Sequence, residues 1–373
     1  MAFELATWER LTGVSAGVEL RLPHDAVAQL SLGRRPRAGH FAADVGQLAG
    51  LVGADLTRLA NLLRSVEVIS TFVGASAVMA SHGGASMLAA ARDRDVEGKY
   101  FGRLPDVDVA DTGWLSKAVE RLWDPADSSD RFPRDFELRL LTELPIALVE
   151  MSGLRVASLS GWMMAQGLPA LDQLSDRSLR GCLLAYAGVG IIFVDADDSP
   201  DERRATLAHE GAHFLLDYVL RREEIARRQP ELLDVLDGVR PSSPREQFEA
   251  LIADLPLGMH VRLFDRGEEG GFACHDVEDS EQRADRVALE LLAPARAVLD
   301  RAGNDAQAPA VQKLLLEEFG LPAGLARRYA HTLVRFRPRK TRSFLEIIDL
   351  DDSGARGNHH SAGDKPHGEG TSD

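Results

Sequence analysis

The chain contains two histidines and a glutamate in the order His209-Glu210-Gly211-Ala212-His213. Residues four apart lie on one face of a helix, so both imidazoles can bind one Zn²⁺. The glutamate between them then lies close enough to a water molecule on the metal to take its proton. With 11 histidines in 373 residues, composition gives roughly a 3% chance of one accidental match. We therefore predict a zinc site with His209 and His213 as ligands and Glu210 as the catalytic base; the alternative is a pair of hydrogen-bonded core histidines.

A second segment can supply the third protein ligand that a catalytic zinc site needs. Small and apolar residues recur at helical spacing from Ala284 to Leu292, and Pro294 ends the pattern. Glu281 and Asp285 are four residues apart and border this stripe. We predict that Glu281 binds the metal and that Asp285 hydrogen-bonds the outer nitrogen of a ligand histidine. The alternative is that both carboxylates belong to a solvated, charged helix face.

The elements expected to position these groups are a β-hairpin and the helix that follows it. Two apolar runs, at 182–187 and 191–195, flank a glycine-rich turn, a pattern typical of a hairpin. Ser199 followed by Pro200, with Glu202 three residues after the serine, indicates a capped helix start. The helix would therefore begin near Pro200 and carry both histidines.

Peptide hydrolysis also needs a group that stabilises the negative charge on the carbonyl oxygen. Tyr218, His260 and His275 are candidates for this role, and the sequence does not choose among them. Asp217 lies one turn beyond His213 on the same face. It is either a second carboxylate behind a ligand histidine or an acid at the surface near the helix end.

Three further stretches carry predictions about single elements. Residues 144–151 are expected to form a helix, and residues 154–158 a short strand. The stretch from Val68 to Ala91 contains no Lys, Arg, Asp or Glu, and is long enough to cross a bilayer. Its Ala, Ser and Gly content favours a pair of closely packed helices in a soluble domain over a membrane span.

The segments quoted above resemble one known family. Arg203–Asp217 resembles the metal-binding motif of the ImmA/IrrE family of zinc metallo-endopeptidases, and Glu281–Pro294 resembles that family's second motif. Ile191–Asp195 is similar to the strand before the family's metal helix, and residues 311–333 are similar to its C-terminal helical segment. The likeness covers residues 140–335.

The resemblance implies a single-metal endopeptidase in the cytoplasm that cleaves a DNA-binding repressor, and so controls transcription or a stress or mobile-element response. In that family's chemistry His209, His213 and Glu281 would bind Zn²⁺, and Glu210 would be general base and then proton donor. The chain departs from the usual second motif at three positions, with Asp285 for asparagine, Val287 for phenylalanine and Ala293 for methionine.

Together these patterns predict an α+β fold that is mostly helical, with a small β-sheet packed against the metal-binding helix, as in zincin-like peptidases. Changes in composition suggest the boundaries between regions. We expect, in order, a helical N-terminal domain (1–124), a linker (125–135), a zinc metallopeptidase domain (136–336) with an insert at about 221–280, and a basic, then disordered tail (337–373).

Residues 30–64 carry a pattern compatible with a helix-turn-helix. Ala49 lies four residues before Gly53, a small residue and a turn glycine that let two helices meet closely. An ordinary αα-hairpin has the same pattern. The second helix would offer DNA only three polar side chains, those of Arg58, Asn61 and Arg64.

This segment leads to an alternative function, a transcriptional regulator or sensor that uses a peptidase-like domain for binding without proteolysis. The chain has 43 Lys+Arg against 58 Asp+Glu, and its net charge of −15 opposes non-specific nucleic-acid binding by the whole protein. Two cysteines cannot form a disulfide framework, which favours reduced thiols in a cytosolic protein. The sequence leaves the oligomeric state, the substrate and the activating signal open.

Overall fold

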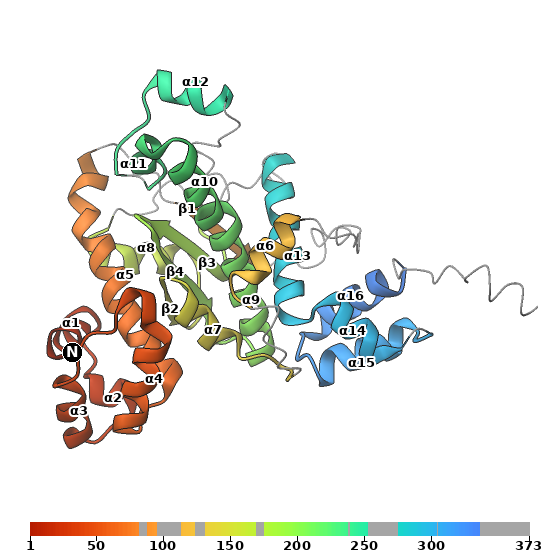
Figure 1. Ribbon diagram of the computed structural model, residues 1–373, viewed down its shortest axis with the longest axis horizontal. Helices are drawn as coiled ribbons and strands as arrows, with labels where there is room; N and C mark the ends of the chain where they lie inside the picture. The colour runs from red at the N-terminus through yellow and green to blue at the C-terminus, as the bar shows by residue number, and fades with distance from the viewer. Residues whose placement is uncertain are drawn as a thin grey trace, which may run out of the picture. The chain divides into compact units, whose positions relative to one another are not determined.

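A computed structural model describes residues 1–81, 88–94, 113–123, 131–168, 175–237, 239–252, 275–303 and 305–335. The predicted α+β class is confirmed, because the chain is mostly helical with one small mixed sheet (Figure 1). Met1–Phe336 form one compact unit, which contains the linker predicted at 125–135. Most of that linker, the end of the insert at 253–274 and the predicted tail at 337–373 lie outside the described residues.

Helices make up the N-terminal region. The chain turns between the last two helices at Gly53, whose φ of 69° lies in the left-handed region that glycine adopts without strain. This confirms the helical hairpin that both interpretations of residues 30–64 share. The elements are α1 (Ala2–Thr12), α2 (Ala16–Leu20), α3 (His24–Ser31), the 3₁₀ turn η1 (Ala38–His40), α4 (Phe41–Val52) and α5 (Leu56–Ser81).

The helix pair predicted within Val68–Ala91 is wrong. Helix α5 continues to Ser81, and the end of the stretch belongs to strand β1 (Leu88–Asp93). Alanine-rich runs carry little periodic signal, so the pairing of β1 with a neighbouring strand decides its conformation. Among the described residues, no helix combines the length and the apolar character that crossing a bilayer requires.

Four strands form the sheet, in the order β1-β3-β4-β2. The predicted hairpin is confirmed as β3 (Leu179–Tyr186) and β4 (Val189–Asp195), which pair antiparallel. Ala187 and Gly188 form its two-residue turn with φ of 47° and 87°, and positive φ at both central residues is the geometry that matches the twist of a hairpin. Strand β1 pairs antiparallel with β3, and β2 (Ile146–Met151) pairs parallel with β4.

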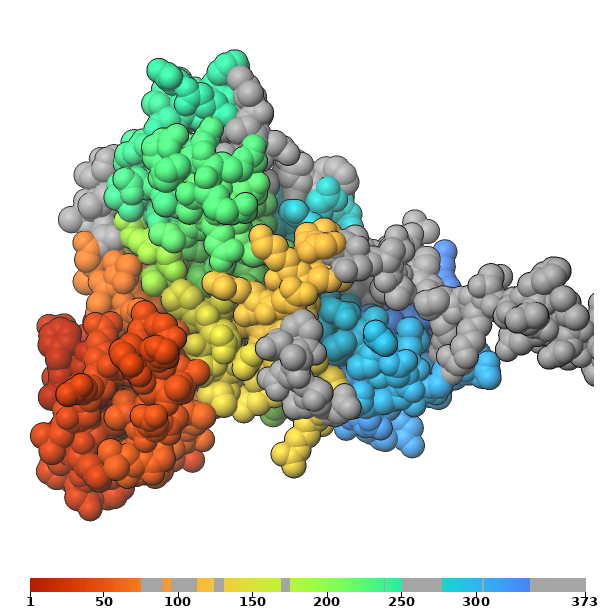
Figure 2. Space-filling view, in the orientation of Figure 1, coloured from red at the N-terminus to blue at the C-terminus, as the bar shows by residue number. Residues whose placement is uncertain are grey.

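Two local predictions near β2 are wrong. Residues 146–151 form a strand instead of a helix, and residues 154–158 contain the start of helix α8 (Val156–Ala165). A short apolar run does not distinguish strand from helix by periodicity, and parallel pairing with β4 settles it here. On α5, the Asn61 side chain donates to the carbonyl of Leu148 at 3.0 Å and accepts from its N–H at 2.9 Å. The N-terminal helices thus bond directly to the sheet, and Figure 2 shows them against the yellow segment that carries β2.

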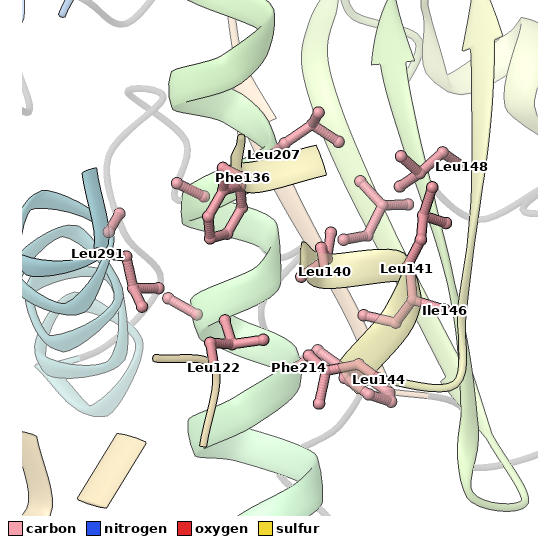
Figure 3. Close-up of a cluster of buried hydrophobic side chains, with 14 of the residues drawn as sticks. Leu122, Phe136, Leu140, Leu141, Leu144, Ile146, Leu148, Leu207, Phe214 and Leu291 are labelled. Carbon is pink, nitrogen blue, oxygen red and sulfur yellow. The ribbon is translucent and has the colours of Figure 1, made fainter. Parts of the chain in front are cut away.

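Helix α9 (Pro200–His213) packs on the sheet, mainly over β3 and β4, with α7 (Phe136–Glu143) and α13 (His275–Leu292) against its other sides. Figure 3 shows the apolar side chains between these elements. Two glycines permit the close packing. A Cβ on Gly181 would lie 2.3 Å from Thr206 Cγ2 of α9, and one on Gly211 would lie 3.0 Å from Leu140 Cδ1 of α7. The expected packing of a small sheet against the helix that carries His209 and His213 is therefore present.

The remaining helices surround this centre. Ser243 and Glu246 cap the start of α12 reciprocally. At the C-terminal end, Tyr329 donates to the carbonyl of Ala293 at 3.2 Å, which fixes α16 to the chain just after α13. The elements are α6 (Gly113–Glu120), α10 (Leu220–Arg228), η3 (Pro230–Leu232), α11 (Leu233–Leu236), α12 (Pro244–Ile252), α14 (Ala295–Ala302), α15 (Ala308–Glu317) and α16 (Ala323–Arg335).

Candidate metal centre

The motif histidines lie in the last turns of α9. The helix begins as predicted, with Ser199 accepting from the N–H of Glu202 and a proline in the first turn. His209, Glu210 and His213 are all buried, with at most 3% of any of them exposed. The sheet and the two neighbouring helices thus take this end of α9 out of water.

Glu281 meets the two histidines from the neighbouring helix α13. Its Oε2 lies 3.3 Å from Nε2 of His209, and its Oε1 lies 3.8 Å from Nε2 of His213. The two Nε2 atoms are 3.2 Å apart. Ala284 and Ala288 of α13 are buried, and their small side chains let α13 lie close to α9. One ligand atom from each of the three residues falls within 4.8 Å of the others, so the group could hold a metal ion.

A carboxylate lies behind each histidine. Asp285 Oδ1 is 2.9 Å from Nδ1 of His209, where the sequence analysis placed it. Asp217 Oδ2 is 2.8 Å from Nδ1 of His213. A histidine that presents Nε2 to a metal carries its proton on Nδ1 and donates it to such a carboxylate, which fixes the ring's orientation. Both rings are therefore held with Nε2 facing Glu281.

Asp217 is buried, which excludes the alternative of an acid at the surface. The chain continues from α9 into a π-helical turn, η2 (Phe214–Val219), an irregularity often found at functional sites. Within that turn Asp217 also accepts from Ser280 Oγ at 2.8 Å and from the Arg221 guanidinium at 3.1 Å. Its position four residues after His213 was the available signal, but only the packing of α13 shows that it is enclosed.

The charges of the cluster attract one another strongly. Burial alone would raise the pKa of Glu281, but its interactions with the imidazoles of His209 and His213 hold that pKa well below its ordinary value. Burial alone would lower the pKa of His213, but Asp217 and Glu281 raise it well above its ordinary value. The pKa of His209 is raised in the same way by Asp285 and Glu281. A divalent cation bound between the imidazoles and Glu281 would take the place of protons on these groups.

Two buried carboxylates have oxygens without a hydrogen-bond donor. In the described part of the chain, neither oxygen of Glu210 has one, nor does Oε1 of Glu281. Burial raises the pKa of Glu210, and the positive charges of His209 and His213 oppose that rise. A buried acid without donors is costly unless a partner arrives. Two histidines and a glutamate are the ligand set of one class of catalytic zinc site, which leaves a position for water, so the residues fit such an ion.

Tyr218, one of the three candidates for the oxyanion role, is not brought to this cluster. The Tyr218 hydroxyl donates to Asp237 at 2.7 Å and accepts from the N–H of Gly188 at 2.5 Å, so it secures the hairpin turn instead. Tyr218 is therefore not a suitable candidate for the oxyanion role, because Gly188 and Asp237 engage its hydroxyl. His260 and the side chain of His275 lie outside the described residues.

The polar side chains offered to DNA by α5 are bonded within the chain. Arg58 donates to the carbonyl of Glu19 at 3.0 Å, and Asn61 bonds Leu148. Arg64 is buried, donates to the carbonyl of Leu141 and stacks on an aromatic ring. These contacts fit the αα-hairpin interpretation and make α5 the element that joins the N-terminal helices to the sheet.

Comparison with known proteins returned no match among family models, curated proteins or solved structures. The assignment of a function therefore depends on the geometry of the cluster and on the motifs themselves.

Proposed function

We propose that the chain is a zinc-dependent endopeptidase with a zincin-like catalytic region. The observation that carries this proposal is the convergence of His209, His213 and Glu281 beside the buried, donor-free carboxylate of Glu210. A metal site that served structure alone would be closed by a fourth protein ligand and would need no adjacent base. The described residues offer three ligands and a base, which is the composition of a hydrolytic site.

Zinc in this site would polarise the scissile carbonyl and lower the pKa of water to about 7. Glu210 takes a proton from the attacking water as its oxygen bonds to the carbonyl carbon, and the C=O π electrons move to the carbonyl oxygen. Glu210 then gives that proton to the amide nitrogen as the C–N bond breaks. Peptide and water thus become a carboxylic acid and an amine, and a proton then passes from the acid to the amine to give a carboxylate and an ammonium group. Asp217 and Asp285 keep the imidazoles in position throughout.

The substrate class follows from the resemblance alone. Members of the ImmA/IrrE family are expected to cleave a regulatory protein, so we propose a DNA-binding repressor of helix-turn-helix type as the substrate, cleaved in the cytoplasm. The alternative, a regulator that binds DNA through residues 30–64, is weakened because Arg58, Asn61 and Arg64 are engaged inside the chain. No separate observation favours it.

Metal analysis and a cleavage assay test the proposal together. Wild type should hold about one zinc per chain, Glu281→Ala should lose it, and Glu210→Gln should keep it. The matched control is Glu278→Ala, a carboxylate one turn earlier on α13 that is not a ligand. Repressors encoded beside this gene serve as substrates, with products read by mass spectrometry. Cleavage by Glu210→Gln at the wild-type rate, or a wild type without metal, would overturn the proposal.

A further inference from the structure

Strand β1 brings a buried arginine to the catalytic end of α9. Arg92 lies opposite Gly181 of β3 in the antiparallel register, and the irregularity of that pairing comes only after it. Arg92 is only 8% exposed. Charged side chains are seldom enclosed, so the direction that Arg92 takes from β1 decides which groups its charge acts on.

The alternation of β1 gives the direction of the side chain. Ala90 belongs to the core cluster that contains Ala205 and Ala208 of α9, whereas Ala91 belongs to the cluster on the other face of the sheet, with Cys182. Residues two apart on a strand share a face. Arg92 therefore extends from the same face as Ala90, toward α9.

The point of β1 that carries Arg92 is next to the catalytic glutamate. A Cβ on Gly181, its partner in the register, would lie 3.2 Å from Oε1 of Glu210. Burial raises the pKa of Glu210, and Arg92 is among the positive groups that lower it again. The positive charges of His209 and His213 act on Glu210 in the same direction as that of Arg92.

We propose that Arg92 is a catalytic residue that contacts the substrate and stabilises the negative charge developing on the carbonyl oxygen of the scissile peptide. This inference rests on the proposed peptidase function. Water attacks beside Glu210, so the oxygen that becomes negative forms within a few ångströms of that carboxylate. A fixed guanidinium from a rigid strand can donate two hydrogen bonds to it in a site that excludes water. The role is the one for which Tyr218 is unsuited.

Anion affinity at the loaded metal site tests this role without a known substrate. Cobalt(II) replaces zinc in the purified protein, and its visible spectrum follows titration with acetohydroxamate, an anionic metal ligand, and with imidazole, a neutral one. In Arg92→Gln we expect acetohydroxamate to bind about 10- to 100-fold more weakly, with imidazole affinity and cobalt content unchanged. Arg92→Lys keeps the charge but not the paired donors, so its affinity for acetohydroxamate should lie between those of wild type and Arg92→Gln.

Arg203→Gln is the matched control, because Arg203 lies on α9 itself but pairs with Glu150 at the surface. It should bind both ligands like wild type. Equal acetohydroxamate affinity in Arg92→Gln and wild type overturns the inference and leaves the metal site intact. A parallel loss of imidazole affinity also overturns it, because the role is then structural. If Arg92→Gln does not fold, an Arg92→Lys variant with wild-type affinity for acetohydroxamate overturns it instead. Failure of wild type to take up cobalt refutes the peptidase proposal itself.

Discussion

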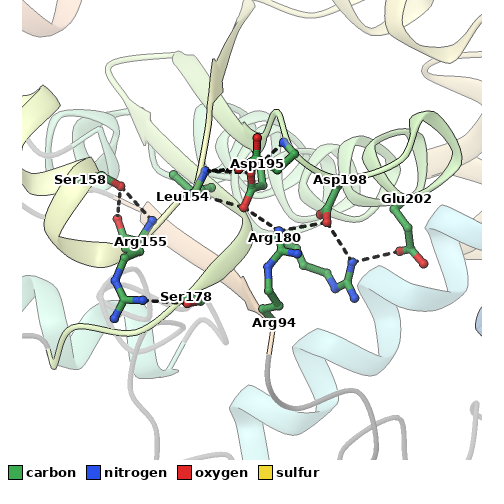
Figure 4. Close-up of polar contacts among 11 residues, drawn as sticks. Arg94, Leu154, Arg155, Ser158, Ser178, Arg180, Asp195, Asp198 and Glu202 are labelled. Atoms are coloured by element: carbon green, nitrogen blue, oxygen red, sulfur yellow. Dashed lines mark hydrogen bonds and ion pairs between the residues drawn. The ribbon is translucent and has the colours of Figure 1, made fainter.

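Two buried acidic groups lie near the two ends of α9 and differ in how they are satisfied. At the end of β4, Asp195 accepts from the backbone N–H groups of Gly153, Leu154 and Asp197, and from the guanidinium of Arg94 (Figure 4). These donors account for both oxygens of the carboxylate. Asp195 thereby fixes the loop between β2 and α8 against the start of the segment that leads into α9.

The acids at the other end of α9 have the opposite character. Glu210 has no donor among the described residues, and Glu281 has one oxygen without any. A low-dielectric interior strengthens satisfied networks and penalises unsatisfied ones. The comparison teaches that a carboxylate saturated by donors stabilises the fold, whereas one buried without donors costs stability unless a partner binds it.

Replacing an acid at each end should break or confirm this contrast. Asp195→Asn removes the charge opposite Arg94, and we expect the free energy of unfolding to fall by about 3–5 kcal/mol. Glu210→Gln should leave the unfolding free energy of the metal-free protein unchanged or higher, because a neutral amide is less costly to bury. Urea denaturation in the presence of a chelator measures both, and equal losses in the two variants would contradict the distinction.

The carboxylates behind the histidines should affect metal affinity instead of folding. We expect Asp217→Asn to weaken zinc binding by about 10- to 100-fold, since the acceptor behind His213 loses its negative charge. Asp285→Asn should have the smaller effect, because the Asp285 side chain is 22% exposed and water can replace it. Competition with a chromophoric chelator gives both affinities. If neither variant differs from wild type, the two aspartates do not position the ligands.

The pH dependence of stability should reverse when metal binds. The pKa values of His209 and His213 are raised in the folded state, so protonation of these imidazoles stabilises the metal-free protein. This stabilisation is complete below the ordinary histidine pKa of 6.5 and is lost as the pH rises through the raised pKa values. The lowered pKa of Glu281 acts oppositely: its contribution is present above the ordinary 4.5 and is lost on acidification. Metal-free protein should therefore be most stable between pH 4.5 and pH 6.5, and its free energy of unfolding should fall toward alkaline pH.

Zinc-loaded protein should gain stability over the same alkaline range, because ligand imidazoles must be neutral. We expect a change of the order of 1 kcal/mol in each direction, which is about one pKa unit. Urea unfolding at about pH 5.5 and about pH 8, with and without zinc, measures this change in the free energy of unfolding. Parallel trends in the two forms would show that these imidazoles do not exchange protons for metal. His209→Ala serves as control, since it should remove the difference.

Much of the centre was predictable because its determinants are local. Ser199 and Pro200 begin α9, the four-residue spacing places His209 and His213 on one face, and the turn between β3 and β4 follows from its glycine. Helical periodicity also marked α13. Capping, spacing and periodicity act over a few residues, so a single segment of the sequence contains all the information that they need.

Tertiary structure alone decided the rest. Pairing with β4 makes residues 146–151 a strand, and pairing with β3 does the same for β1. The packing of α13 encloses Asp217, and the register of β1 directs Arg92 toward Glu210. These outcomes depend on contacts between segments far apart in the chain. Short apolar runs and single charged residues carry no local signal for such contacts, so their roles are fixed only when the segments meet.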